Sequence, residues 1–429
     1  MRVQNNGGIS MTDIKYNRWY CVIGAVLIQF CLGVVYVWSI FLKPIVAATG
    51  WAVSNVSLAY TISLAVLPVT MIIGGYLTPK MGPRLVAMLG GAMVCAGMFI
   101  AGNASSVTML WFGYGFLCGG GVGVSYGIPI STLTKWFPDK RGMITGLAVG
   151  SLGFGSFVFS KVAYYIMTQV GVLSTFPIMG IIVLIGVFLG ALLIKAAPDG
   201  YAPPGWTPAV NKAGGPTTYN FKPKEMLNTY QYYYLFIMYA FIMICSLMII
   251  GHASPIGQKV ASLTPVQAST IVGLLGLFNS GGRIAWGALS DKLGRLRSIM
   301  IMSIISGAAM FSMNYLSSFW MFAIGVSLIA ICFGGSVGVF PAITADNFGP
   351  KYVGINYGLV LLAYSVGAIV GPIMATKVIE ITGGDYSIAF IISGCLCIIG
   401  AVMAFFYKSP SAPNVQKSNG SDLITNKQS

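Results

Sequence analysis

Gly287-Ala-Leu-Ser-Asp291-Lys-Leu-Gly294-Arg295-Leu-Arg297 is a short polar stretch between two long apolar runs, and it decides the fold. Gly75-Tyr-Leu-Thr-Pro-Lys-Met-Gly-Pro-Arg84 occupies the corresponding place 212 residues earlier. A second pair of loops, Trp136-Phe-Pro-Asp-Lys-Arg-Gly142 and Asn347-Phe-Gly-Pro-Lys-Tyr-Val-Gly354, lies about 211 residues apart. Such internal symmetry indicates two copies of one structural unit.

The composition places these two units in a membrane. Of the 429 residues, 56% are hydrophobic and 8% are charged, whereas soluble domains carry about 25% charged residues. Twelve spans of about 20 apolar residues would use roughly 240 residues, a little over half of the chain. We therefore predict an all-α membrane protein, and we exclude a soluble enzyme, a DNA-binding protein and a disordered chain.

Breaks at glycine, proline and charged residues divide the apolar runs into twelve expected helices. The expected spans are 20–46, 54–78, 85–103, 107–137, 143–169, 173–195, 231–258, 266–290, 298–316, 318–347, 354–378 and 386–407. The only long polar stretch between them predicts a linker that separates two six-helix bundles. The expected organisation is a first bundle at 1–195, a linker at 196–230, a second bundle at 231–407 and a tail at 408–429.

The basic residues predict the orientation, because cytoplasmic loops carry the excess of Lys and Arg. With both ends of the chain inside, 19 of the 24 Lys and Arg are cytoplasmic. They are Arg2, Lys15, Arg18, Lys80, Arg84, Lys135, Lys140, Arg141, Lys195, Lys212, Lys222, Lys224, Lys292, Arg295, Arg297, Lys351, Lys408, Lys417 and Lys427. Only Lys43, Lys259 and Lys377 fall outside, and Lys161 and Arg283 lie within helices. We expect a multi-pass protein of the cell (inner) membrane with both termini cytoplasmic.

Neither cysteine nor histidine predicts a metal or a cofactor. All eight cysteines lie in apolar stretches without the Cys/His spacing of a metal site, and the chain has one histidine. No acid–base pair lies at one depth in the membrane, so we predict no enzyme activity. The net charge of +15 does not indicate nucleic acid, because the basic residues punctuate apolar runs. The first apolar stretch is too long for a signal peptide.

Arg283 is the residue that predicts a function. It lies eight residues before Asp291, which is about 12 Å along a helix and near the middle of the membrane. A guanidinium at this depth costs at least about 2.5 kcal/mol unless it faces water or a partner. Since no carboxylate occupies the centre of any span, we predict an anionic ligand, which a guanidinium can bind through two parallel hydrogen bonds. The alternative is an arginine bound to backbone carbonyls at a helix break.

The same depth estimate brings polar residues of other helices to the level of Arg283. Gln29, Tyr126 and Tyr364 lie about nine to eleven residues from the inner ends of their helices. Asn279 lies one turn from Arg283 on the same helix face. Together these groups predict a site for one carboxylate, although each tyrosine alone is equally typical of a helix contact.

Two other polar residues fall near the outer boundary. Lys161 is about 27 Å above the inner boundary, where its side chain can extend to the interface. His252 lies some 20 residues into its helix, and its titration range suits a proton relay. A capping or loop role is the alternative for His252.

The loop at 287–295 resembles the signature of the major facilitator superfamily between the second and third helices, and its repeat. This resemblance implies the superfamily's twelve-helix fold and assigns Asp291, Lys292, Gly294, Arg295 and, in the first half, Arg84 to loops that control conformation. The first-half copy departs from the signature. Thr78-Pro79 stands where Ser290-Asp291 stands in the second half, which puts the usual first-half charge latch in doubt.

Further stretches resemble the oxalate/formate antiporter family, which is related to the monocarboxylate transporters. They are Gly33-Val-Val-Tyr36-Val-Trp38-Ser, Gly123-Val-Ser-Tyr126-Gly, Lys135-Trp-Phe-Pro-Asp-Lys-Arg-Gly142, Asn279-Ser-Gly-Gly-Arg283, Phe340-Pro341 and Asn356-Tyr357-Gly358. The resemblance implies a carrier of small carboxylates in which Arg283 binds substrate. It also implies that Tyr36, Trp38 and Tyr126 line the cavity, and it adds Tyr357 to the candidates.

Two departures refine this expectation. Oxalate carriers of the family place a lysine where this chain has Tyr364, so a single central cation faces the substrate, and a monocarboxylate fits that charge better than oxalate does. Animal monocarboxylate transporters carry an aspartate where this chain has Asn279, which cannot titrate. A coupled proton would then travel on Lys161, His252 or the substrate acid.

The sequence therefore predicts a monomeric carrier of L-lactate or pyruvate that moves its substrate with a proton by alternating access, without any cofactor. Its partners are a small carboxylate, a proton and the lipid bilayer, with no nucleic acid. An oxalate/formate-type exchanger is the first alternative. A transceptor that senses a carboxylate without net flux is the second.

Overall fold

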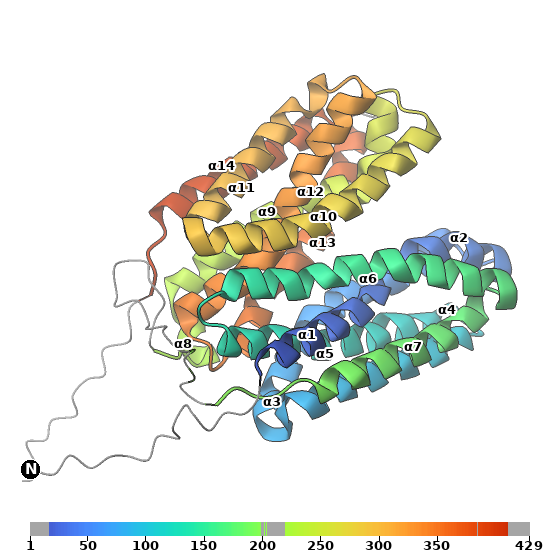
Figure 1. Ribbon diagram of the computed structural model, residues 1–429. Coiled ribbons are helices and arrows are strands. Elements are labelled where there is room, and N and C mark those ends of the chain that lie inside the picture. The colour runs from blue at the N-terminus through green and yellow to red at the C-terminus, as the bar shows by residue number, and fades with distance from the viewer. Residues whose placement is uncertain (1–16, 199–200, 202, 204–218, 384, 411–429) are drawn as a thin grey trace, which may run out of the picture.

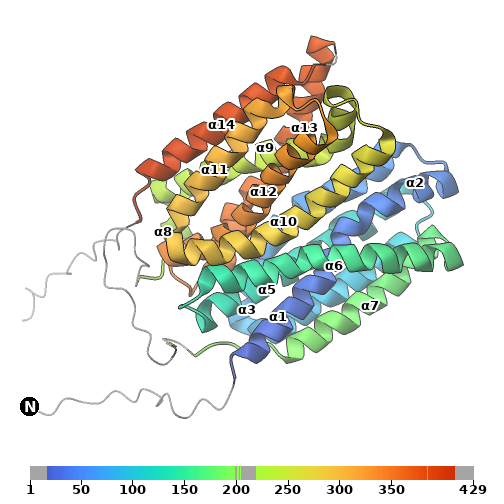
Figure 2. The ribbon, with the colours of Figure 1, turned by 45° about the horizontal axis from the view of Figure 1, so that its top comes forward.

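The computed structural model describes residues 17–198, 201, 203, 219–383 and 385–410. Within these residues every regular element is a helix. The first-half helices form one bundle and the second-half helices form another, and both views show the two bundles side by side (Figures 1 and 2). Most of the expected linker and tail lies outside the described residues, as do Arg2, Lys15, Lys212, Lys417 and Lys427.

Nine elements make up the first half. They are α1 (Trp19–Leu32), η2 (Gly33–Val37), α2 (Trp38–Thr49), α3 (Val53–Gly102), α4 (Val107–Leu110), η3 (Trp111–Cys118), α5 (Gly119–Trp136), α6 (Arg141–Val170) and α7 (Val172–Leu192). The 3₁₀ segment η2 joins α1 to α2 as one span, and the π-helical segment η3 joins α4 to α5. Two spans are contained in α3, because its backbone breaks at Gly82.

The second half begins with a short helix and continues with six spans. Its elements are α8 (Pro223–Leu227), α9 (Tyr230–Val260), α10 (Pro265–Leu293), α11 (Arg295–Ser312), η4 (Met313–Tyr315), α12 (Phe319–Phe348), α13 (Val353–Thr382) and α14 (Ser387–Phe406). Ten stretches of the described residues are long and apolar enough to cross a membrane. Splitting α3 adds one and the less apolar α10 adds another, so the expected twelve spans are present.

Turn glycines reveal the repeat in the backbone. Gly82 and Gly294, 212 residues apart, have φ of 80° and 91° and break the chain between successive helices. Gly171 and Gly383, again 212 residues apart, have φ of 86° and 68°. Glycine adopts these left-handed values without the strain that a Cβ would cause. The two halves therefore turn at equivalent positions.

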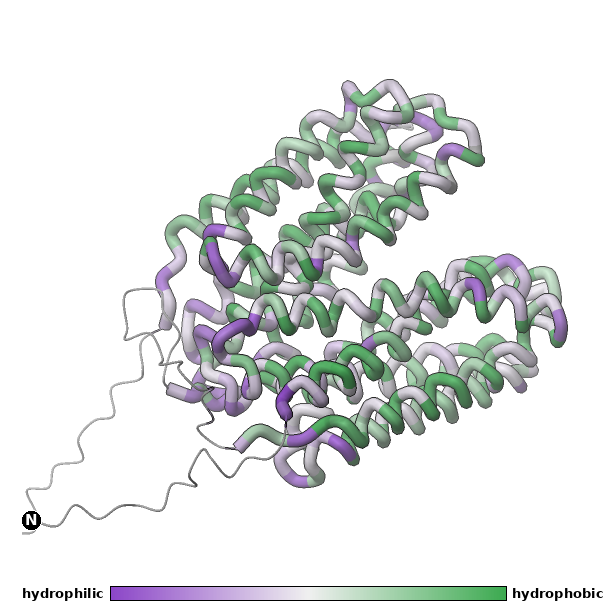
Figure 3. The backbone as a smooth tube through the Cα atoms, in the orientation of Figure 1, coloured by the Kyte–Doolittle hydropathy of each residue, from purple (hydrophilic) through white to green (hydrophobic). Residues whose placement is uncertain are grey.

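The outer surface of the bundles is apolar and the ends are polar (Figure 3). Exposed large hydrophobic side chains such as Phe154, Phe157, Ile185 and Phe405 lie on the span helices. In water such a surface would aggregate, whereas in lipid it is the expected solvent contact. The helix α5, by contrast, is buried along nearly its whole length.

One end of the molecule, which we call the basic end, carries the loops at 80–84, 136–141, 291–297 and 348–353. The two halves meet there and diverge toward the opposite end (Figure 1). At the basic end Trp136 Nε1 donates a hydrogen bond of 2.7 Å to Lys195 O in the first half. In the second half Phe221, just before α8, donates from its backbone N to Phe348 O at 2.9 Å. The segments on either side of the expected linker are thus attached to different halves.

Candidate functional site

A cavity of about 430 Å³ lies between the two halves. First-half residues such as Tyr36, Tyr60 and Ser156 face second-half residues such as Arg283 and Tyr364 across it. Arg283 lies ten residues from the basic end of α10, nearer to that end than the other lining residues lie on their own helices. The cavity extends from Arg283 toward the opposite end, where the halves diverge.

Arg283 is 2% exposed, and its guanidinium joins the two halves. Nη1 donates to Val149 O on α6 at 2.9 Å, and Nε donates to Asn279 Oδ1 on its own helix at 3.2 Å. A guanidinium has five N–H donors, so these two bonds leave donors for a ligand in the cavity. The contact with Val149 O realises part of the alternative reading, in which backbone carbonyls hold the arginine, but no carboxylate pairs with Arg283 among the described residues.

Asn279 orients the arginine. Its side-chain oxygen accepts from Arg283, and its backbone carbonyl lies against Gly334 of α12 so closely that a Cβ at that glycine would collide with it. An amide oxygen accepts this bond without adding a negative charge. Arg283 therefore keeps its full charge for an anion.

Aromatic rings form much of the remaining wall of the cavity. Tyr36, Tyr60 and Tyr364 line it, and Phe333 lies 6.4 Å from Tyr364 between ring centroids. The hydroxyls of Tyr36 and Tyr364 neighbour each other although they belong to different halves. Phenols give both an apolar wall and hydrogen-bond donors without charge, which suits a small organic anion.

Of the eight predicted substrate-binding residues, Arg283, Asn279, Tyr36 and Tyr364 line the cavity. The structure does not bring the other four to its wall. Gln29 is fully buried and donates from Nε2 to Tyr126 O at 3.1 Å. Trp38 packs on Tyr114 with ring centroids 4.3 Å apart. Tyr126 and Tyr357 are 5% and 0% exposed.

The two predicted proton carriers also lie away from the cavity wall. Lys161 is exposed, with Nζ 4.5 Å from the centre of the Phe157 ring. His252 is half-buried beside Gly251, which does line the cavity, and its Nδ1 has no hydrogen-bond partner. Neither residue contacts Arg283.

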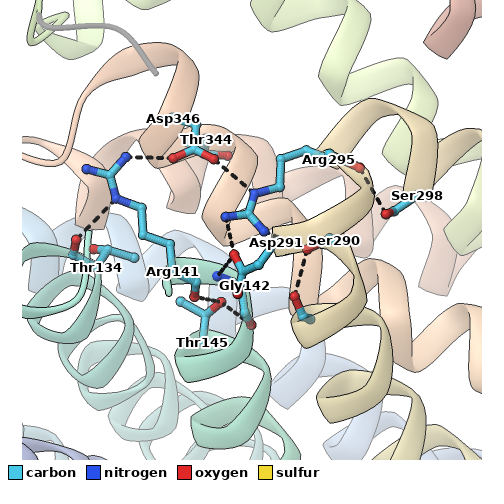
Figure 4. Close-up of polar contacts among 12 residues, drawn as sticks. Thr134, Arg141, Gly142, Thr145, Ser290, Asp291, Arg295, Ser298, Thr344 and Asp346 are labelled. Atoms are coloured by element: carbon cyan, nitrogen blue, oxygen red, sulfur yellow. Dashed lines mark hydrogen bonds and ion pairs between the residues drawn. The ribbon is translucent and has the colours of Figure 1, made fainter. Parts of the chain in front are cut away.

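Charged side chains close the basic end between the halves (Figure 4). Asp346 at the end of α12 accepts from Arg141 Nη1 of α6 at 2.6 Å and from Arg295 Nε of α11 at 2.9 Å. The Arg141 and Arg295 side chains are only 8% and 14% exposed. Ion pairs this sheltered are screened less by salt than surface pairs are.

Asp291 strengthens this closure from the signature loop. Its two carboxylate oxygens accept from the backbone N–H of Gly142 at 2.9 Å and of Met143 at 2.7 Å, in the first turn of α6. A carboxylate at a helix N-terminus satisfies free N–H groups and complements the helix dipole. Asp291 also pairs with Arg295 Nη2 at 2.7 Å, so the second-half loop holds the first half of the molecule. Lys292 beside it is exposed.

Asp346 and the pairing role of Arg141 did not follow from the sequence. Arg141 counted only as a cytoplasmic charge, and its partner is 205 residues away. One signal was available. Asp346 is one of only nine acidic residues, and it directly precedes the repeated loop that starts at Asn347.

Comparison with known proteins agrees with this architecture. The sequence profile of the Major Facilitator Superfamily matches residues 22–316 and 262–427. The oxalate:formate antiporter of Oxalobacter formigenes is 31% identical over 92% of this chain and 92% of its own length. An uncharacterized MFS-type transporter of Escherichia coli, YhjX, is 32% identical over 84% of this chain and 88% of its own length.

More distant relatives extend the comparison. Monocarboxylate transporter 13 of Rattus norvegicus is 25% identical over 86% of this chain and 83% of its own length. A solved structure of the transporter FucP in an outward conformation superimposes with a TM-score of 0.69 at 13% identity, covering 91% of this chain and 99% of that chain. The last comparison concerns the fold alone.

Proposed function

The chain belongs to the major facilitator superfamily, and from this premise we propose that it carries small monocarboxylates such as L-lactate or pyruvate together with a proton. The observation that carries the proposal is Arg283, which is 2% exposed at the deepest point of the cavity between the halves. Among the described cavity-lining residues it is the only charged one. Its unused N–H donors bind the carboxylate, Asn279 holds its orientation, and Tyr36 and Tyr364 close around the substrate.

The charge of the site favours one carboxylate over two. An anion leaving water for a partly apolar cavity must be compensated by charge and hydrogen bonds. Oxalate brings two negative charges to one arginine, because the position of the family's second cation is occupied by Tyr364. Lactate and pyruvate each bring one charge and a small polar or carbonyl group that the tyrosine hydroxyls can meet.

Alternating access then proceeds by movement of the two halves about this site. With the basic end inside, as the positive-inside count predicts, the structure is open outward and its inner side is closed by Asp346 and Asp291. Inward opening separates Arg141 from Asp346, Asp291 from α6, and Val149 from Arg283. We propose that one chain performs this cycle as a monomer in the cell (inner) membrane, with both termini cytoplasmic.

The proton is carried by Lys161, by His252 or by the substrate's own carboxyl group. Asn279 does not serve, since an amide has no titratable proton in this range. His252 is the protein group nearest to the cavity, because the adjacent Gly251 lines it.

Anion exchange is the second candidate function. Its support is the 31% identity to the oxalate:formate antiporter over nearly the whole chain. An exchanger needs an internal anion for flux and ignores a proton gradient, whereas a symporter concentrates its substrate when protons flow inward.

Uptake of labelled L-lactate into proteoliposomes tests the proposal. We expect concentrative uptake under an inward proton gradient, and its collapse with a protonophore. Arg283→Ala should remove uptake, a loss of at least about a hundredfold if one charged hydrogen-bonded contact is worth about 3 kcal/mol. Arg84→Ala, which removes a cation of the basic end, is the matched control and should retain uptake. Normal uptake by a folded Arg283→Ala protein would contradict the proposal, and flux that requires internal anion would favour exchange.

A further inference from the structure

Three tyrosine side chains meet beneath the cavity, on the basic-end side of Arg283. We call Tyr126, Tyr239 and Tyr357 the hydroxyl cluster. Tyr126 belongs to α5 of the first half, whereas Tyr239 and Tyr357 belong to α9 and α13 of the second. Their hydroxyl groups neighbour one another across the boundary between the halves. Tyr239 was not among the residues that the sequence singled out.

The cluster lies below the floor of the cavity. Tyr126 and Tyr239 lie ten and nine residues from the basic ends of their helices, level with Arg283, and Tyr357 lies only four residues from the start of α13. None of the three lines the cavity, and they are 5%, 0% and 0% exposed. Tyr126 and Tyr239 are nevertheless close enough to interact with the charge of Arg283.

The polar atoms of this region are not satisfied in the outward-open structure. The hydroxyls of Tyr239 and Tyr357 have no hydrogen-bond partner, and neither do Gln29 Oε1 and Asn356 Oδ1. Buried polar groups are nearly always hydrogen-bonded, because leaving one unpaired costs free energy. Tyr239 is also held rigidly, since its ring stacks on Phe340 at 4.0 Å between centroids. Four unpaired polar atoms between the cavity floor and the basic end call for a partner in another state of the molecule.

That partner has a defined chemistry. Phenol hydroxyls donate hydrogen bonds to a carboxylate, and the cluster lies within reach of the guanidinium that would hold that carboxylate first. When the basic end opens, the halves separate along the boundary that the cluster spans, so its hydroxyls become accessible from that side.

On the proposed function, we propose that the hydroxyl cluster is a second carboxylate subsite, which receives the substrate from Arg283 once the basic end has opened. The three phenols carry no positive charge, so they hold the anion more weakly than the guanidinium does. The substrate thus passes from a charged to an uncharged set of donors on its way out at the basic end. The unpaired hydroxyls of the outward-open state are the empty half of this subsite.

Thiol labelling tests the location without any substrate. Tyr239→Cys is treated with a membrane-impermeant maleimide in right-side-out and in inside-out membrane vesicles. Lys140→Cys, exposed at the basic end, identifies the side, and the wild-type protein gives the background of its eight native cysteines. We expect Tyr239→Cys to react only from the side on which Lys140→Cys reacts. Reaction from the other side, or from neither side, overturns the proposal.

Transport kinetics test the role of the hydroxyl. In Tyr239→Phe we expect the half-saturation concentration of L-lactate to rise about tenfold on the basic side, the effect of one hydrogen bond to a charged group, and to stay unchanged on the opposite side. Tyr232→Phe on the same helix is the matched control, because its hydroxyl already donates to Leu359 O at 3.3 Å. It should change neither value.

Equal changes on both sides, or no change, overturn the second subsite. A wild-type protein that does not carry lactate contradicts the proposed function instead, and the labelling result then still decides whether Tyr239 lies on the path.

Discussion

The two signature loops occupy equivalent places in the two halves but close the basic end in different ways. Each turns at a glycine, Gly82 or Gly294, with φ near 80–90°. The second-half loop reaches across to the first half, where Asp291 accepts from two backbone N–H groups of α6. The first-half loop offers no such acceptor, since Pro79 stands at the position of Asp291.

The polar groups of the first-half loop are used within their own half. Thr78 Oγ1 donates to Gly74 O at 2.7 Å, and Arg84 Nε donates to Ile194 O at 2.6 Å. Across the boundary the loop offers only close packing, because Gly75 lies against the backbone of Ile355 at the start of α13. One seam is charged and one is steric. The comparison teaches that a repeat can preserve the turn and lose the latch, so that closure depends on the second-half loop and Asp346.

The largest effect is expected from Asp346→Asn. This change removes the charge shared by Arg141 and Arg295, and leaving sheltered arginines unpaired costs about 2–3 kcal/mol of the closed state. We expect the population with an open basic end to rise by more than tenfold. The measurement is the distance distribution between spin labels on Lys140→Cys and Lys292→Cys, which are exposed on opposite halves.

Asp139→Asn is the matched control for this prediction. Asp139 is also at the basic end, and its ion pair of 2.9 Å is with Arg18 of the same half. It loses the same charge without touching the boundary, so the label distances should stay as in the wild type. If Asp346→Asn leaves the distances unchanged, or if both variants open equally, the charged seam does not hold the closed state.

A smaller shift is expected from Asp291→Asn. The amide oxygen can still accept one of the two N–H groups of α6, while the pair with Arg295 and the favourable charge at the helix N-terminus are lost, together about 1 kcal/mol. The same pair of labels should report an opening of severalfold, below that of Asp346→Asn. An opening as large as that of Asp346→Asn would mean that the loop, and not the shared carboxylate, dominates closure.

Hydropathy and helix rise were sufficient for much of this architecture. The twelve spans follow from apolar runs, and depth along a helix placed Arg283, Asn279, Tyr36 and Tyr364 where the cavity is. Rise gives height but not the direction in which a side chain points. Trp38 follows the 3₁₀ segment η2, and Tyr126 follows the π-helical segment η3, and each of these segments changes the rotation of the residues after it.

Contacts across the boundary between the halves were beyond the sequence. Asp346 and Arg141 are 205 residues apart, and Arg283 and Val149 are 134 apart. No local periodicity reports such a pair, because it arises only when two bundles pack in one particular conformation. The missing acid at Pro79, however, was visible in the sequence, and it is the residue at which the two loops can be made alike.

The smallest effect is expected from restoring that acid. Pro79→Asp places a carboxylate beside the first turn of α13, where it can act on the helix N-terminus as Asp291 acts on α6, worth about 0.3–1 kcal/mol. Pro79→Asn is the control, because it removes the same ring and regains the same backbone N–H without the charge. We expect Pro79→Asp to slow lactate exchange about two- to fivefold relative to Pro79→Asn, since opening the basic end must now break a second latch. In the Asp291→Asn background it should reverse part of the opening seen by the spin labels. Equal behaviour of Pro79→Asp and Pro79→Asn in both assays would show that the start of α13 does not accept a latch, and that the asymmetry lies in the helices and not in one missing carboxylate.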